Sequence, residues 1–142
     1  MERNFIDGYT EWQANPEIVG VNRLPQHATL MPYENFDEAK KADRYASSRC
    51  KLLNGKWKFK LYKNYAYKPS DFAQPHYDAH NWDSIIVPGS WQMQGYDQPQ
   101  YCNVRYPWEG SEDICPPNAP TKHNPVGCYL KKIHINAAAL QK

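Results

Sequence analysis

The chain has 142 residues, which is enough for one domain with a hydrophobic core but not for a multidomain enzyme. Lysine and arginine number 17 against 15 aspartates and glutamates, and because the two signs are interspersed, a polycationic nucleic-acid tail is excluded. The 12 prolines and 7 glycines disfavour long helices, and the 14% aromatic content disfavours disorder.

No stretch of the chain reaches the roughly 20 apolar residues that a membrane helix requires. The first residues also lack the apolar segment of a secretory signal. We therefore expect a cytoplasmic protein without a membrane or nucleic-acid partner. No CxxC pair occurs, so the 4 cysteines are expected to be reduced thiols.

The first 33 residues alternate turn formers with isolated apolar residues and follow neither the helical nor the strand period. This pattern predicts an extended arm that lies on another surface. Residues 34–42 place acidic residues first and lysines last, which favours a short surface helix through the helix dipole. We accordingly expect an arm with one helix at residues 1–45 and a β-domain at residues 46–142.

The β-domain is expected to contain three short strands. Lysine alternates with large apolar residues at 56–63, which predicts a strand with one buried and one solvated face. A β-branched run at 84–87, stopped by Pro88, predicts the second strand, and alternation at 128–135 predicts the third. The proline- and glycine-rich residues 88–127 predict a long loop, and loops of this length are usually functional.

The sequence also predicts which residues of this loop are exposed and which one anchors it. The acidic residues Asp97 and Glu112 are expected to be solvated surface carboxylates, and Trp91 is expected to anchor the loop. So few strands do not close a β-sandwich by themselves. Either the strands pair with a partner, or the sequence is a truncated part of a longer chain.

Five segments are more specific than composition or periodicity. In chain order they are NRLP with HA (22–28), LNGKWKF (53–59), VPGSWQMQGYD (87–97), PQYCNVRYP (99–107) and NPVGCY (124–129). In this order and spacing they resemble the amino-terminal part of the large bacterial β-galactosidases of glycoside hydrolase family two. The resemblance extends from about Trp12 to Ile135.

The resemblance implies an all-β fold, an incomplete jelly-roll, galactose-binding-like β-sandwich with an extended N-terminal arm and long loops. It also implies a parent enzyme that hydrolyses terminal β-D-galactosides such as lactose with retention, uses Mg²⁺ and Na⁺, and forms a homo-oligomer. The two catalytic glutamates of that family lie on a TIM barrel beyond this chain. No catalytic residue is therefore expected here, and the chain alone is expected to be inactive.

The resemblance also implies a substrate-binding residue, Asn103. In the family, the asparagine at this place reaches into the active site and contacts galactose, and an amide both donates and accepts hydrogen bonds. From the residues alone, the alternative is that Asn103 holds a turn through its side chain. Tyr101 is expected to stack nearby, with a position in the core as the equal alternative.

A metal site in the arm is implied more weakly. In some relatives an acid and an asparagine help to hold Mg²⁺, and these correspond to Glu11 and Asn15 in this sequence. Oxygen ligands suit a hard cation. One additional residue separates the pair here compared with the family pattern, so an ordinary exposed arm is the alternative.

Two functions remain open from the sequence. The first is an N-terminal fragment of a β-galactosidase that supplies a galactose-contacting loop and an oligomer-contacting arm to the remainder of the polypeptide. The alternative is a free-standing, non-catalytic carbohydrate-binding module whose aromatic surface holds galactosides. Retaining hydrolysis needs two carboxyl groups about 5–5.5 Å apart, and no pair among the 15 acidic residues can be assigned that role.

Overall fold

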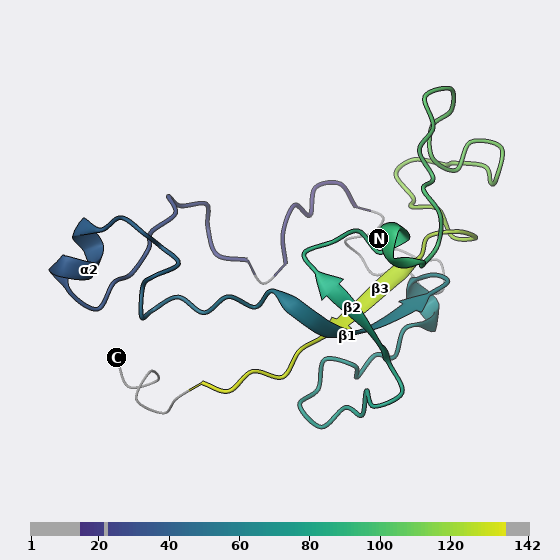
Figure 1. Cartoon of the computed structure of the whole chain (residues 1–142). Helices are drawn as coiled ribbons and strands as arrows, with labels where there is room; N and C mark the ends of the chain where they lie inside the picture. The colour runs from purple at the N-terminus through teal and green to yellow at the C-terminus, as the bar shows by residue number, and fades with distance from the viewer. Residues whose placement is uncertain (1–14, 22, 136–142) are drawn as a thin grey trace, which may run out of the picture. The chain divides into compact units, whose positions relative to one another are not determined.

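A computed structural model of the chain describes residues 15–21 and 23–135. It divides into two compact units (Figure 1). The sheet unit comprises Gly55–Lys142 together with Met1–Val19, and the small unit comprises Gly20–Asn54. The domain boundary expected between residues 45 and 46 stays a prediction.

The sheet unit is built on a three-stranded antiparallel sheet in the order β2-β1-β3 (Figure 1). The strands are β1 (Gly55–Tyr62), β2 (Asp83–Val87) and β3 (Val126–Leu130). The two strands predicted at 56–63 and 84–87 are confirmed with shifts of one residue, and the all-β class is confirmed with them.

The third strand was predicted with the wrong boundaries, because β3 begins two residues earlier than expected and ends at Leu130. Gly127 lies opposite Leu61 in the ladder, although the sequence assigned it to the loop. A Cβ atom at Gly127 would lie 2.5 Å from the Trp91 ring, so the strand needs glycine at this position. The expected extension to Ile135 fails because pairing with β1 stops at Leu130 within the described residues.

One face of the sheet carries an aromatic core centred on Phe59, which is 0% exposed. Its ring lies 4.7 Å from that of Tyr96 in an edge-to-face arrangement, 4.8 Å from that of Tyr129, and 6.1 Å from that of Trp91. These centroid distances fall in the range in which aromatic pairs add to simple burial. The predicted buried face of the 56–63 strand and the anchoring role of Trp91 are therefore confirmed.

The opposite face, expected to be solvated, is exposed at Lys56 and Lys60 but is covered near Lys58 and Tyr62, so the prediction is confirmed only in part. Cys128 lies on the lysine-bearing face and is 2% exposed. The chain between β1 and β2 packs over it through Trp82, whose ring meets those of Tyr62, Phe72 and Tyr77. This segment shows no sustained period, and it therefore carried no sequence signal for its position.

The small unit contains one helix, α2 (Phe36–Lys40), which confirms the short helix predicted at 34–42. Asn35 is its N-cap, because its side-chain oxygen accepts a hydrogen bond of 2.9 Å from the Glu38 backbone N–H. Residues 15–21 and 23–33 contain no helix or strand, as expected for an extended arm. None of the helices in the described part of the chain has the length and apolar character needed to cross a bilayer.

Candidate functional site

The long loop leaves β2 through a short 3-10 helix, η2 (Gln92–Gln94), that fixes its start. Gly95 ends this turn in the left-handed conformation, with a φ of 90° that favours glycine. Trp91 and Tyr96 on either side of η2 both pack against Phe59. The loop therefore begins from a point held by the aromatic core.

A side-chain clamp strengthens this start. Gln94 Nε2 donates to the Ile86 carbonyl at 3.0 Å, and Gln94 Oε1 accepts from the Ile86 N–H at 2.8 Å. The amide thus satisfies both backbone groups of an edge-strand residue, as a neighbouring strand would. The clamp ties η2 to β2 directly.

Asp97 follows this anchored turn and differs from its predicted environment. Its side chain is 9% exposed rather than solvated, and its backbone has a positive φ of 58°. One carboxylate oxygen lies 3.7 Å from His123 Nε2, and the other is buried without a hydrogen-bond partner in the described part of the chain. Burying a carboxylate oxygen without a hydrogen bond costs free energy. The packing of the surrounding loop must therefore hold Asp97 in this position.

Hydrogen bonds across the loop hold its far half. The Trp108 indole donates to the His123 carbonyl at 2.6 Å, and the Lys122 N–H donates to Glu112 at 2.8 Å. The second oxygen of Glu112 is buried, so the expectation of a fully solvated carboxylate is wrong here too. These bonds bring residues near 108–112 and 122–123 together without a strand between them.

The loop lines a half-open cavity of about 290 Å³. Its lining combines aromatic rings with charged and amide groups, including Gln98, Gln100, Arg105, Tyr106, Trp108, Glu109 and His123. Small-molecule sites commonly combine apolar walls with a few polar groups that fix orientation. The cavity is near the lower end of the usual size range of about 300–1,000 Å³ and suits a small polar ligand.

Asn103 lies at the tip of a tight turn beside this cavity. The Arg105 N–H donates to the Cys102 carbonyl at 3.2 Å and closes the turn through the backbone. The amide of Asn103 is exposed and makes no hydrogen bond within the described residues. The turn therefore does not need the Asn103 side chain, which leaves its donors and acceptor available for a ligand.

The predicted sugar-contacting residues lie beside the cavity and do not line it. Tyr101 is 68% exposed and is therefore not a core residue of the sheet unit. Neither Tyr101 nor Asn103 lines the cavity, although their neighbour Cys102 does. Asp97 and His123 were missed as a pair, because 25 intervening residues without a regular period give no signal that the two meet.

The metal site expected at Glu11 and Asn15 stays a prediction, because only one of the two residues lies in the described part of the chain. Glu11 lies outside the described residues. The Asn15 side-chain oxygen accepts a hydrogen bond of 3.0 Å from the Glu17 N–H, which is a local turn interaction. Within residues 15–21 and 23–135, no three His, Cys, Asp or Glu side chains are grouped so that they could hold a metal ion.

Comparison with known proteins connects this geometry to a family. Residues 50–142 match the model of the glycosyl hydrolases family 2, sugar binding domain. The chain is 50% identical over 125 residues to the β-galactosidase of Priestia megaterium and 42% identical over 124 residues to that of Halalkalibacterium halodurans. It is also 37% identical over 138 residues to the β-galactosidase large subunit of Leuconostoc lactis.

These alignments cover most of this chain but little of the relatives. They include 88%, 87% and 89% of this chain, respectively. They include only 12%, 12% and 21% of the three relatives. The similarity is therefore to one part of much larger proteins.

Proposed function

Because this chain belongs to family 2 of the glycosyl hydrolases through its sugar binding domain, we propose that it serves as the N-terminal part of a β-galactosidase. The observation that carries the proposal is the 50% identity over 88% of the chain with the Priestia megaterium enzyme. In this proposal the chain supplies a sugar-contacting loop, and the remainder of the polypeptide supplies the catalytic carboxyl groups for hydrolysis of β-D-galactosides such as lactose.

The fold that we propose for the complete domain is a jelly-roll, galactose-binding-like β-sandwich. Two features support it. The apolar layer around Phe59 on one face of the sheet is of the kind that lies between the two sheets of a sandwich. The outer edge of β3 has no strand beside it in the described part of the chain, so it can accept a further strand.

The role that we propose for Asn103 is a hydrogen bond to a galactose hydroxyl. Its support is the exposed amide, which has no partner among the described residues, at the tip of a turn that the backbone closes. Tyr101, exposed two residues earlier, is proposed to contact the same sugar by stacking. The nearby cavity adds aromatic and polar groups of the kind that sugars use.

The role that we propose for the arm is contact between subunits of the larger enzyme. Val19, Leu24 and Leu30 are exposed in segments without regular structure, and exposed apolar residues gain stability when another surface covers them. Mg²⁺ and Na⁺ are proposed as ions of the larger enzyme, with Glu11 and Asn15 as candidate Mg²⁺ ligands. A cytoplasmic location is proposed as well. A free-standing carbohydrate-binding module is not favoured, because the relatives compared are β-galactosidases.

A chimeric enzyme tests the proposal. This chain would replace the matching 125 residues of the Priestia megaterium β-galactosidase, and hydrolysis of a chromogenic β-galactoside would be measured. We expect hydrolysis by the chimera and none by this chain alone or by the enzyme without its matching segment. A folded chimera that does not hydrolyse the substrate, or hydrolysis by the chain alone, would contradict the proposal.

The same chimera tests Asn103. We expect Asn103→Ala to lower kcat/KM by roughly 5- to 150-fold, the equivalent of about 1–3 kcal/mol for a lost polar contact. Asn118→Ala is the matched control, since Asn118 is another exposed asparagine of the same loop, and its kcat/KM should be unchanged. Equal kinetics for the two variants would remove Asn103 from the sugar site.

A further inference from the structure

A second cavity lies on the lysine-bearing face of the sheet, opposite the face that holds Phe59 and the start of the long loop. It has a volume of about 760 Å³ and is bounded by residues 73–80 and by the ends of β1 and β3. Its walls carry Lys56 and Lys58 from β1 and Lys132 from just beyond β3. We call this cavity the lysine cleft.

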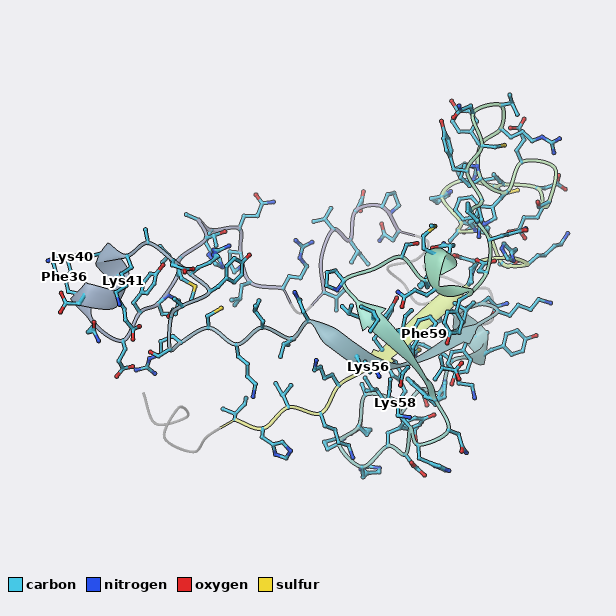
Figure 2. The ribbon with its side chains drawn as sticks, in the orientation of Figure 1. Phe36, Lys40, Lys41, Lys56, Lys58 and Phe59 are labelled. Carbon is cyan, nitrogen blue, oxygen red and sulfur yellow. The ribbon has the colours of Figure 1, made fainter. Side chains whose placement is uncertain are left out.

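The strand period explains why lysines gather there. Successive side chains of a strand point to opposite faces, so Lys56 and Lys58 share one face while Phe59 lies on the other (Figure 2). Lys58 pairs in register with Leu130 of β3, which places an apolar side chain on the same wall. The cleft therefore has a positively charged floor with an apolar part.

Lys58 is held rigidly in this cleft. Its ammonium group donates to the Trp82 carbonyl at 2.8 Å and to the His80 carbonyl at 3.0 Å. An ammonium group has three N–H donors, and the described residues use two of them. A fixed cation with a remaining donor is a preorganised group for an anion, because little side-chain entropy is lost on binding.

The cleft also holds one negative charge, which hydrogen bonds from a neighbouring residue stabilise. Asp78 is its one acidic lining residue, and hydrogen bonds from the backbone N–H and the ring of His80 lower the pKa of that carboxyl, with Lys132 contributing through its charge. His80 Nδ1 lies 2.7 Å from Asp78 Oδ2. His76 adds a second imidazole to the wall. Lys56 and Lys58 therefore face the cleft without an acidic partner in the described residues.

From this arrangement we propose that the lysine cleft binds a phosphate group carried on a small organic molecule. Lysine ammonium groups recognise phosphate as point charges, and a volume of about 760 Å³ exceeds what a free phosphate fills. Leu130 and the alanines of the 73–80 segment would contact the organic part. This site is distinct from the loop of Asn103, so it does not depend on the proposed function.

Titration calorimetry on the full 142-residue chain tests the proposal with three probes, AMP, inorganic phosphate and adenosine. We expect saturable binding of AMP, weaker binding of inorganic phosphate, and no binding of adenosine. AMP binding should weaken when NaCl is raised from about 0.05 to about 0.5 M, because salt screens exposed charges. Equal binding of AMP and adenosine, or no saturable AMP binding, would overturn the proposal.

Matched charge variants locate the site. Lys56→Gln with Lys132→Gln should weaken AMP binding roughly tenfold, because two exposed cations of the cleft are removed. Lys40→Gln with Lys41→Gln removes the same charge from exposed positions in and beside α2 (Figure 2), and AMP binding should not change. Equal losses in both variants would indicate non-specific attraction and overturn the proposal.

NMR spectroscopy of the unaltered chain locates the bound AMP without any substitution. The ring protons of His76 and His80 should shift in NMR spectra as AMP is added, because both imidazoles line the cleft. Those of His27, in the small unit, should not shift. Saturable AMP binding that leaves the two cleft histidines unchanged would place the ligand elsewhere and overturn the proposal.

Discussion

The sheet unit and the small unit are each stabilised by a different kind of internal interaction. In the sheet unit, one apolar side chain from each strand is buried, namely Phe59, Ile85 and Cys128, and the Phe59 ring packs against that of Tyr96. In the small unit, no apolar side chain is buried among the described residues, and Ser47, at 4% exposed, is the residue that lies inside. The sheet unit is therefore stabilised mainly by the packing of buried apolar side chains, and the small unit mainly by hydrogen bonds.

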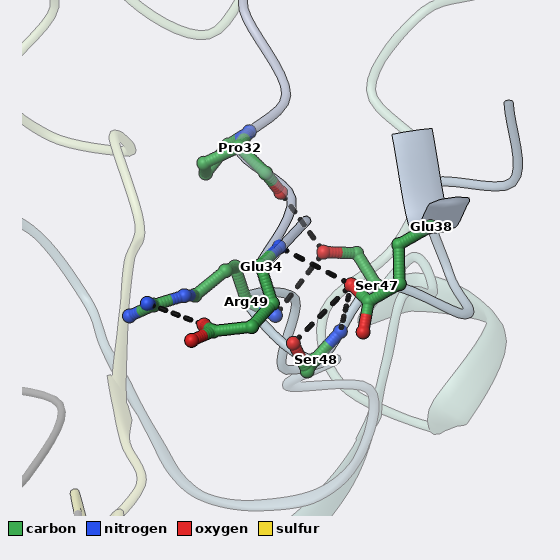
Figure 3. A network of polar contacts seen from close by, with 6 residues as sticks. All are labelled: Pro32, Glu34, Glu38, Ser47, Ser48 and Arg49. Atoms are coloured by element: carbon green, nitrogen blue, oxygen red, sulfur yellow. Dashed lines mark hydrogen bonds and ion pairs between the residues drawn. The ribbon is translucent and has the colours of Figure 1, made fainter. Parts of the chain in front are cut away.

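The polar network of the small unit is drawn in Figure 3. Glu38 Oε2 accepts from the backbone N–H groups of Glu34 and Ser48 and from the Ser48 hydroxyl, at 3.3–3.4 Å (Figure 3). The Ser47 hydroxyl donates to the Pro32 carbonyl at 2.9 Å and accepts from the Arg49 N–H at 3.1 Å. Arg49 also forms an ion pair with Glu34.

The sheet unit should be the more stable of the two units. Folding exchanges hydrogen bonds with water for internal ones, so each bond contributes only about 0.5–1.5 kcal/mol net. Full burial of a large apolar side chain contributes about 1.5–3 kcal/mol. We therefore expect the small unit to open locally at a lower free energy than the sheet unit unfolds.

The largest expected effect comes from truncating the buried core. Phe59→Ala should lower the free energy of unfolding of the sheet unit by about 3–5 kcal/mol, because a fully buried ring is replaced by a cavity. Urea unfolding followed by tryptophan fluorescence measures this change. Phe36→Ala is the control, since Phe36 in α2 is 73% exposed, and it should change stability by less than about 0.5 kcal/mol. Similar losses for both variants would contradict the contrast between the units.

A smaller effect is expected from adding volume. Gly127→Ala would place a Cβ atom 2.5 Å from the Trp91 ring and 2.8 Å from the Phe59 ring. Overpacking of this kind should cost about 1–3 kcal/mol in urea unfolding. At Gly20 in the small unit, the nearest atom to a new Cβ is the flexible Arg23 side chain at 3.1 Å. Gly20→Ala should therefore be nearly neutral, and a loss as large as that of Gly127→Ala would show that packing does not distinguish the units.

The parts of the fold that could be predicted from the sequence are those with local causes. The period of two at 56–63 predicted β1, and the charge order at 34–42 predicted α2, because each pattern reflects which face meets water. The predicted start of β3 was too late because Gly127 was assigned to the loop. This glycine is needed because the Trp91 ring, which is far away in sequence, packs against it, and the residues around Gly127 alone do not show that contact. The cover on the lysine-bearing face was missed for the same reason.

The candidate site divides in the same way. Asn103 was identified by its motif, and its position on a turn agrees with the loop prediction for 88–127. Asp97 was expected to be solvated, because acidic residues in loops usually are. Its burial depends on His123 and on the fold of the loop as a whole. Long-range contacts of this kind lie beyond periodicity and composition.

Interrupting the polar network of the small unit should lower its free energy of local opening by about 1 kcal/mol. Ser47→Ala removes the hydroxyl that joins the Pro32 carbonyl to the Arg49 N–H, and water can replace only part of that bridge. Hydrogen exchange at the Arg49 amide should become roughly fivefold faster, because local opening becomes easier. Ser48→Ala removes an exposed hydroxyl contact and should change this rate by less than twofold or so. Faster exchange in Ser48→Ala than in Ser47→Ala would contradict the central place of Ser47.

Of these variants, Tyr62→Phe should change the free energy of unfolding least near neutral pH. Its stability should differ from that of the unaltered chain only in alkaline solution. Burial, together with the nearby Tyr77 and Cys128, raises the pKa of Tyr62 from 10.0 to about 12. The folded state therefore holds this proton more tightly than the unfolded state, so the associated stability is fully present below pH 10 and is lost as the pH rises towards 12. Burial, with a hydrogen bond to Asp83, also raises the pKa of Tyr96, which shifts stability in the same direction.

Urea unfolding of the sheet unit at several pH values measures this dependence. Stability should fall more gently above pH 10 in Tyr62→Phe than in the unaltered chain, because one titrating group is removed while its ring remains. Tyr45→Phe removes an exposed hydroxyl of the small unit and is the control, because it changes no group of the sheet unit. Identical profiles for Tyr62→Phe and the unaltered chain would mean that the Tyr62 hydroxyl is solvated in the folded state. Trp82 and its neighbours would then not cover the lysine-bearing face as the ring contacts indicate.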